Sequence, residues 1–160
     1  SIKGVELLLR SFQKIKHKNV RLLLAGRENE PNYIDGLKKI YLDDRVKFVG
    51  FVKPEDFFKQ VDVLIHPTLW FEPFARSIIE SFSYKVPVIA SYKGGNIEAI
   101  DSNKTGFLFK SDKELINRIN YFIDNRHVID DMKSHCLDKA KSLLADNIVD
   151  QYIKVYNKVI

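Results

Sequence analysis

Two glutamates eight positions apart, Glu72 and Glu80, are the residues of this 160-residue chain whose spacing says most about chemistry. Pro73 follows the first of them, and Pro is favoured at the first position of a helix, where a missing N–H is not needed. We therefore expect a helix over residues 73–84, with Glu72 as its cap. Eight residues at about 100° each leave Glu80 roughly 80° from Glu72 around the axis. Both carboxylates can then border one cleft.

The residues between the glutamates could bind an anion. If the helix starts at Pro73, the backbone N–H groups of Phe74, Ala75 and Arg76 lie in its first turn and have no helical partner. They would stand at the positive end of the helix dipole, which attracts phosphate. This stretch is therefore a candidate phosphate site.

Two plainer interpretations stay open from the residues alone. Glu72 can be an ordinary helix cap, and Glu80 can form a salt bridge to Arg76 one turn earlier. The alternative for Glu80 is a role in ligand binding. Ile78 and Ile79 precede it, which indicates a buried position, and an unpaired carboxylate is costly to bury. A ligand with hydroxyl groups would satisfy it.

The elements that must position these residues follow from the hydrophobic periodicity. Short runs that are apolar throughout alternate with helical patterns, which is typical of an α/β fold with a doubly wound parallel sheet and helices on both faces. Such a sheet binds ligands beyond the carboxyl ends of its strands, where Glu72 would lie. The expected strands are 20–25, 46–49, 63–66, 86–90 and 106–109; the expected helices are 4–17, 32–42, 54–61, 73–84, 96–100, 112–124, 127–143 and 146–159.

Composition indicates one globular domain over residues 1–160, with 45% hydrophobic and 29% charged residues. A single cysteine, Cys136, excludes a disulfide scaffold, fits a reducing cytoplasmic compartment and is expected to be a free structural thiol. No apolar run approaches the ~18 residues of a membrane span. Because a helical pattern begins within a few residues of Ser1, which is not Met, we expect the chain to be part of a longer one.

The net charge of +5 lies entirely in residues 1–60, which hold 13 Lys and Arg against 8 Asp and Glu. A solvated helix face explains Lys14, Lys16 and Lys18, and contact with an anionic membrane surface is the alternative. No nucleic-acid signature is present, so specific nucleic-acid binding is not expected. A GxGxxG fingerprint and a P-loop are also absent. The four histidines share no ligand spacing, so no metal is expected, and His66 is expected to be a packing residue.

Taken in order, several segments resemble retaining glycosyltransferases of the GT-B fold, especially glycosyltransferase family 4. Glu72 and Glu80 match the E-x7-E signature of that family, and Lys3-Gly4 resembles its KG dipeptide. Further segments that resemble the family, in the family's order, are residues 20–26, 46–52, 61–67 and 86–91, Gly94-Gly95 with Glu98, and residues 105–109.

The resemblance implies that the chain is the C-terminal, Rossmann-like half of a two-domain enzyme, truncated at its N-terminus. This half binds a UDP- or GDP-linked sugar donor, and the enzyme transfers the sugar with retention to a glycan or lipid-linked acceptor. The catalytic groups would be Lys3, which neutralises the donor diphosphate, and Glu72, which holds sugar hydroxyls. Charge that develops on the leaving diphosphate would be stabilised by Lys3 and the helix dipole.

The remaining binding roles implied by the resemblance fall on Glu80 and on backbone groups. Glu80 would take the ribose hydroxyls, and backbone groups at Gly50 and Val52 would read the base. The N–H groups of residues 74–76 would bind the diphosphate or sugar. The family commonly needs no metal and no cofactor besides its donor.

The resemblance also implies what this chain lacks. The family's strand before the KG dipeptide and its acceptor-binding half, which carries a catalytic His, are absent, so we expect these 160 residues alone to be inactive. The full enzyme would be cytoplasmic, at or near the inner face of the membrane.

Three departures from the family pattern bear on the donor. Ala75 and Lys85 stand where the family has Gly, and Asn96-Ile97 replaces Ile-Pro. If position 85 needs a left-handed backbone, the strain is of order 1 kcal/mol. Two other functions stay open: half of a GT-B sugar-nucleotide epimerase, or a non-catalytic phosphate-binding regulatory module.

Overall fold

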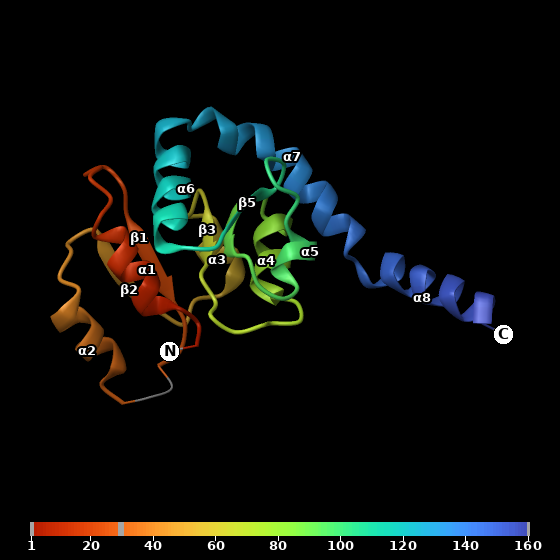
Figure 1. The fold of residues 1–160 in the computed structure, drawn as a ribbon, viewed down its shortest axis with the longest axis horizontal. Helices are drawn as coiled ribbons and strands as arrows, with labels where there is room; N and C mark the ends of the chain where they lie inside the picture. Colours follow the sequence, from red (N-terminus) through yellow and green to blue (C-terminus); the bar gives the residue numbers. More distant parts are fainter. Residues whose placement is uncertain (1, 29–30, 160) are drawn as a thin grey trace.

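A computed structural model of the chain describes residues 2–28 and 31–159, with the backbone alone at 145, 146, 150, 151 and 159. Strands and helices alternate through most of it (Figure 1). The strands are β1 (Leu22–Ala25), β2 (Val46–Gly50), β3 (Leu64–His66), β4 (Val88–Ser91) and β5 (Gly106–Phe109). The helices are α1 (Val5–Phe12), α2 (Tyr33–Ile40), α3 (Pro54–Phe58), α4 (Arg76–Ser83), α5 (Asn96–Ala99), α6 (Asp112–Asp124), α7 (His127–Ser142) and α8 (Ala145–Val159).

The strands are all parallel, as the α/β prediction requires, but they form two sheets instead of one. β1 pairs with β2, and β3, β4 and β5 form a second sheet in that order. Among the described residues no strand bridges β1 and β3. The α/β prediction, with parallel strands between helices, is therefore confirmed, and the division into two sheets is a feature that the hydrophobic pattern did not predict.

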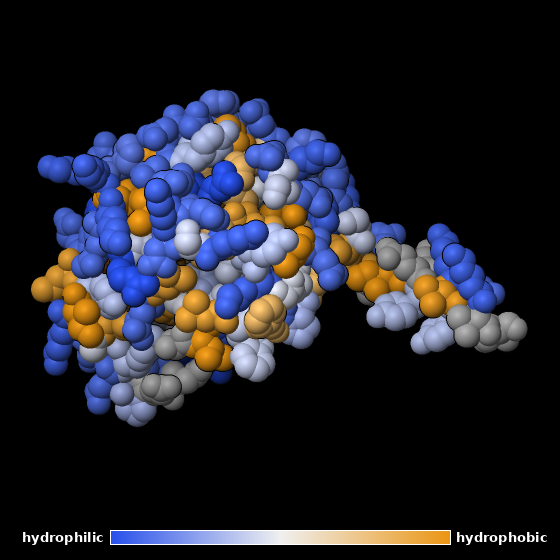
Figure 2. Space-filling model, viewed as in Figure 1, coloured by the Kyte–Doolittle hydropathy of each residue, from blue (hydrophilic) through white to orange (hydrophobic). Residues whose placement is uncertain are grey.

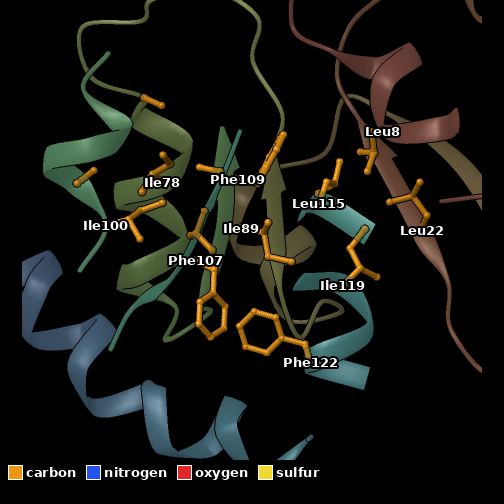
Figure 3. Packing of buried hydrophobic residues seen from close by; sticks show 14 of the residues in the cluster. Leu8, Leu22, Ile78, Ile89, Ile100, Phe107, Phe109, Leu115, Ile119 and Phe122 are labelled. Atoms are coloured by element: carbon orange, nitrogen blue, oxygen red, sulfur yellow. The ribbon is translucent and has the colours of Figure 1, made fainter. Parts of the chain in front are cut away.

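One hydrophobic core joins the two sheets through the helices. Leu8 of α1 and Leu22 of β1 belong to the same buried cluster as Ile89 of β4 and Ile119 of α6 (Figure 3). Helix α1 contacts α6, and α4 contacts α7. Strand β4, in the middle of its sheet, is buried at every position, as expected for a parallel strand covered on both faces.

Local sequence explains where helix α6 begins. Ser111 accepts a hydrogen bond from the backbone N–H of Glu114 at 3.3 Å, and the Glu114 carboxylate accepts one from the N–H of Lys110 at 2.8 Å. This is a Ser-x-x-Glu capping arrangement, which satisfies donors that a helix start leaves open. Helix α6 accordingly has the predicted bounds.

Helix α4 begins three residues later than predicted. Ala75 is its N-cap, with an extended backbone at φ −81° and ψ 110°, so Glu72 and Pro73 lie in a loop. The carbonyl of Glu72 accepts a hydrogen bond from the N–H of Gly95 at 2.8 Å. Tertiary contact with this neighbouring loop overrides the preference of Pro for a first helical position.

Helix α8 extends away from the rest of the molecule (Figure 1), and apolar and polar side chains alternate along it (Figure 2). Its exposed apolar residues include Val149, Tyr152 and Ile153. No helix in the described ranges combines the length and apolar character that crossing a membrane requires.

Candidate active site

A cavity of about 1830 Å³ opens where strands β1 and β3 end and helix α4 begins. Polar side chains of two distant segments line it at this end: Lys3 before α1, and Glu72, Arg76 and Glu80 around the start of α4. The two glutamates therefore do border one cleft, as predicted, although only Glu80 is on the helix.

Lys3, Glu72 and His66 form a connected group at the mouth of the cavity. The Lys3 ammonium Nζ lies 2.9 Å from Oε1 of Glu72, and Nε2 of His66 lies 3.3 Å from Oε2 of the same carboxylate. The hydroxyl of Ser77, in the first turn of α4, lies 3.4 Å from Nδ1 of His66. Each oxygen of Glu72 thus has its own partner, so the carboxylate is held in one orientation.

The electrostatics of this group keep Glu72 ionised and His66 neutral. Partial burial acts to raise the pKa of Glu72, but the hydrogen bond and charge of Lys3, with His66, outweigh burial and leave the pKa below its usual value. Burial lowers the pKa of His66 by more than the neighbouring Glu72 raises it. At neutral pH the group therefore contains one cation and one anion.

Two close backbone approaches fix Lys3 and Glu72 in space. Gly4 has φ 74°, and a Cβ there would overlap the carbonyl of Pro67 just beyond β3. The N–H of Leu69 also donates to the carbonyl of Ile2 at 2.8 Å. On the other side a Cβ on Gly95 would overlap the carbonyl of Pro73. Glycine is needed at both positions because only its hydrogen leaves room for the opposing carbonyl.

Glu80 forms the helical salt bridge that was one of the two interpretations left open by the sequence. Its carboxylate Oε1 lies 3.2 Å from Nε of Arg76, and its side chain is 33% exposed. Of the two interpretations left open by the sequence, the salt bridge to Arg76 is the one present in the structure, and the carboxylate is neither fully buried nor unpaired. Glu80 still faces the cavity.

The backbone groups expected to bind the donor are only partly brought together. Arg76 and Val52 line the cavity, whereas Phe74, Ala75 and Gly50 are not among its lining residues. Ala75 is buried and precedes the helix. In the described chain no residue accepts a hydrogen bond from the N–H of Arg76 or Ser77. The unpaired N–H groups in the first turn of α4 are thus those of residue 76, which was predicted, and of residue 77, which was not.

An exposed apolar loop adjoins the mouth of the cavity. Trp70 is 59% and Phe71 72% exposed, so neither side chain packs into the interior of the molecule. Lys93 holds this loop, since its Nζ donates to the carbonyl of Leu69 at 3.1 Å and lies 5.4 Å from the ring centre of Phe71.

Sequence reasoning missed His66 and Ser77. His66 ends strand β3 six residues before Glu72, and its side chain is only 13% exposed. One feature of the sequence could have identified His66: it is a polar residue at the carboxyl end of a strand, and α/β sheets bind ligands at that edge.

Cys136 is a buried free thiol on α7, as expected, and burial raises the pKa of that thiol to about 12. Among the side chains that the structure describes, no three His, Cys, Asp or Glu residues gather where they could hold a metal ion.

Comparison with known sequences gives consistent matches along the chain. A family model described as glycosyl transferases group 1 matches residues 1–142. Spore coat protein SA of Bacillus subtilis is 28% identical over 173 residues, covering 98% of this chain and 46% of that protein. The O-antigen biosynthesis glycosyltransferase WclY of Escherichia coli is 28% identical over 158 residues, covering 98% of this chain and 44% of that protein. The chain spans less than half the length of these relatives.

Among solved structures, Anabaena Alr3699/HepE in complex with UDP is 25% identical and has a TM-score of 0.83, covering 99% of this chain and 46% of that one. The complex of the same protein with UDP-glucose has a TM-score of 0.82. This likeness confirms the α/β fold class predicted from the sequence.

Proposed function

Because the chain belongs to the group 1 family of glycosyl transferases, we propose that it is the donor-binding half of a retaining glycosyltransferase of family 4. The whole enzyme would transfer a sugar from a UDP- or GDP-linked donor to a glycan or lipid-linked acceptor. The observation that carries this proposal is the group Lys3, Glu72 and His66, which shares one cavity with Glu80 and with the start of α4.

The chemistry required is stabilisation of a leaving nucleoside diphosphate. Lys3 carries a positive charge beside the cavity, and the N–H groups of Arg76 and Ser77 stand at the positive end of α4. Charge developing on the diphosphate as the glycosidic bond breaks would be stabilised most where such donors are already oriented. Lys3 would contact the diphosphate while keeping Glu72 oriented.

The two glutamates would take different hydroxyl groups of the donor. Glu72 is ionised and held by two partners, so its free lone pairs can accept hydrogen bonds from sugar hydroxyls. Glu80 is held by Arg76 and faces the cavity, where it would take the ribose hydroxyls. Backbone groups near Val52 and Gly50 would contact the base. A sugar donor bound in this way needs no metal.

The acceptor would bind to a second domain that this chain does not contain, so these 160 residues alone would not catalyse transfer. Catalysis would take place in the cytoplasm, near the inner face of the membrane. The likeness to HepE, which is solved with UDP and with UDP-glucose, supports the nucleotide-sugar donor.

Calorimetry of the whole protein with UDP, GDP and ADP tests the proposal. One of these nucleotides should bind, and Glu80→Ala should weaken it at least about tenfold, which corresponds to 1.4 kcal/mol. Asp138→Asn is the matched control, because Asp138 is also a helical carboxylate paired with a neighbouring cation, 3.9 Å from Lys141. If no nucleotide binds, or if both variants bind like the parent, the site assignment is wrong.

A further inference from the structure

The ring of His66 has a partner at each of its two nitrogens. Nε2 lies 3.3 Å from Oε2 of Glu72, and Nδ1 lies 3.4 Å from the hydroxyl oxygen of Ser77. His66 ends strand β3, Ser77 lies in the first turn of helix α4, and Glu72 lies in the loop between them. All three residues line the cavity. The ring therefore connects a strand, a loop and a helix beside the candidate donor site.

The charge of Glu72 decides which nitrogen of His66 carries the proton. Because Glu72 is ionised, its oxygens can only accept hydrogen bonds, so Nε2 must donate its N–H to Oε2. Because His66 is neutral, Nδ1 carries a lone pair and accepts the O–H of Ser77. The nearby charge of Lys3 disfavours a second proton on the ring. The hydrogen-bond network thus assigns the Nε2–H tautomer.

A ring held in this way is not available as a general acid or base. A general base needs a lone pair within reach of the proton that it removes from the substrate. The lone pair of Nδ1 is directed at Ser77, and the proton of Nε2 is directed at Glu72. The side chain of His66 is also only 13% exposed. Any effect of His66 on the reaction must therefore act through Glu72 or Ser77.

Glu72 needs this second partner because Lys3 would have another task. The Nζ of Lys3 lies 2.9 Å from Oε1 of Glu72, and the Lys3 side chain is 55% exposed. In the proposed function the same ammonium contacts the donor diphosphate, whose negative charge competes with the carboxylate for it. The contact between Oε2 and His66 does not involve the donor. It is therefore the contact that persists when the donor binds.

We propose that His66 is a positioning residue for the sugar-binding carboxylate, an inference that rests on the proposed function. Its Nε2–H holds Oε2 of Glu72, and Ser77 fixes the ring through Nδ1. Glu72 thereby keeps the orientation that sugar hydroxyls require after Lys3 has turned to the diphosphate. His66 thus contributes to binding of the sugar part of the donor and not to binding of the nucleotide part.

Calorimetry on the whole protein tests this inference by separating sugar from nucleotide. The probes are UDP with UDP-glucose and GDP with GDP-mannose, and the sugar contribution is the ratio of the two dissociation constants within a pair. His66→Asn places an amide near the position of Nδ1, too far from Glu72 for a hydrogen bond. The sugar contribution should then fall at least about fivefold, while the affinity for the nucleotide alone stays within about twofold of the parent.

His66→Gln is the matched variant, because its amide nitrogen lies near the position of Nε2 and can still donate to Glu72. It should keep the sugar contribution within about twofold of the parent. A merely structural role of His66 would lower the affinities for nucleotide and nucleotide sugar together, in both variants. His135→Asn, which replaces an exposed imidazole on α7, controls for the substitution and should change neither affinity.

The tautomer of His66 gives a second readout, which needs no donor. Long-range proton–nitrogen NMR spectra of the whole protein at neutral pH should show a protonated Nε2 and an unprotonated Nδ1. Ser77→Ala should shift the Nδ1 resonance, because this nitrogen loses its hydrogen-bond donor. A proton on Nδ1 in the parent protein would overturn the proposal.

The binding results can also overturn the proposal. It fails if His66→Asn weakens nucleotide and nucleotide sugar equally, or if His66→Gln loses as much of the sugar contribution as His66→Asn. It also fails if a nucleotide binds but its sugar adds nothing to the affinity of the parent protein, and in that case the proposed nucleotide site stands. If no nucleotide binds, the proposed function is wrong and the inference falls with it.

Discussion

His66 connects the carboxylate of Glu72 to the first turn of helix α4 through Ser77. Burial lowers the pKa of His66 in the folded protein, so the unfolded chain binds the proton more readily. Stability linked to this residue is therefore complete above the ordinary pKa of about 6.5 and is lost as the pH falls below it.

His66→Gln should remove the decrease in the free energy of unfolding between pH 7.5 and pH 5.5 that His66 causes. Urea unfolding at the two pH values measures this difference, and the range stays above the pH at which Glu72 takes up a proton. His135→Gln, which removes an exposed imidazole from α7, is the control and should keep the decrease. An unchanged decrease in His66→Gln would contradict the assignment.

Lys85 has a left-handed backbone, with φ 61°, as its replacement of the family's Gly predicts. Such a conformation strains a residue with a Cβ by about 1–2 kcal/mol, and the greater freedom of Gly in the unfolded chain offsets part of the gain. Lys85→Gly should therefore raise the free energy of unfolding by about 0.5–1 kcal/mol.

Asn103→Gly is the control for this prediction, measured in the same denaturant titrations. Asn103 has nearly the same φ, 66°, but Asn tolerates this region through its short polar side chain. An equal gain in both variants, or a loss in Lys85→Gly, would show that backbone strain at position 85 is not the cause.

At the scale of elements, the loop before α4 depends on the turn before α5. A Cβ on Gly95 would overlap the carbonyl of Pro73, and the N–H of Gly95 holds the carbonyl of Glu72. Gly95→Ala should displace this loop, destabilise the protein by about 1–3 kcal/mol and weaken donor binding at least about tenfold.

Gly36→Ala provides the matched control for that substitution. Gly36 lies inside helix α2, and nothing stands within 4 Å of a Cβ placed there. This change should stabilise the protein by about 0.5–1 kcal/mol, with no effect on donor binding in calorimetry. An unchanged donor affinity in Gly95→Ala would show that the position of this loop does not determine donor binding.

Periodicity and end signals predicted most elements well, because these signals are local. The bounds of β5 and α6 agree with the prediction, and Ser111 and Glu114 explain why α6 starts where it does. The start of α4 was missed because the loop of Glu72 is set by Gly95, which is distant in sequence. A contact between residues so far apart in sequence produces no hydrophobic periodicity from which it could be predicted.

The site was predicted in part for the same reason. The spacing of Glu72 and Glu80 located the cleft, and resemblance added Lys3. The position of His66 between Glu72 and Ser77 required the packing of β3 against α4, which no spacing within one segment encodes. The pairing of Glu80 with Arg76 was available as a helical i, i+4 contact.

For the whole molecule, the structure relates the site to the sheet edges beside it. One cavity is lined by Lys3 and Glu72 and by every residue of β1 and β3, so the candidate donor site and these strand edges belong to the same cavity. Hydrophobic periodicity predicts strands but not which of them pair, and the division into two sheets was therefore beyond the sequence pattern.

The most direct test of the account compares a nucleoside diphosphate with its nucleoside on the whole protein, using the nucleotide that binds most tightly. In NMR titrations, Lys3→Ala should lower the affinity for the diphosphate at least about tenfold and leave the affinity for the nucleoside unchanged, because Lys3 interacts with the phosphate charge. Glu80→Gln should lower the affinity for both ligands, because Glu80 would accept hydrogen bonds from the ribose hydroxyls that both ligands carry. Equal weakening of both ligands by Lys3→Ala, or an unchanged nucleoside affinity in Glu80→Gln, would contradict the account.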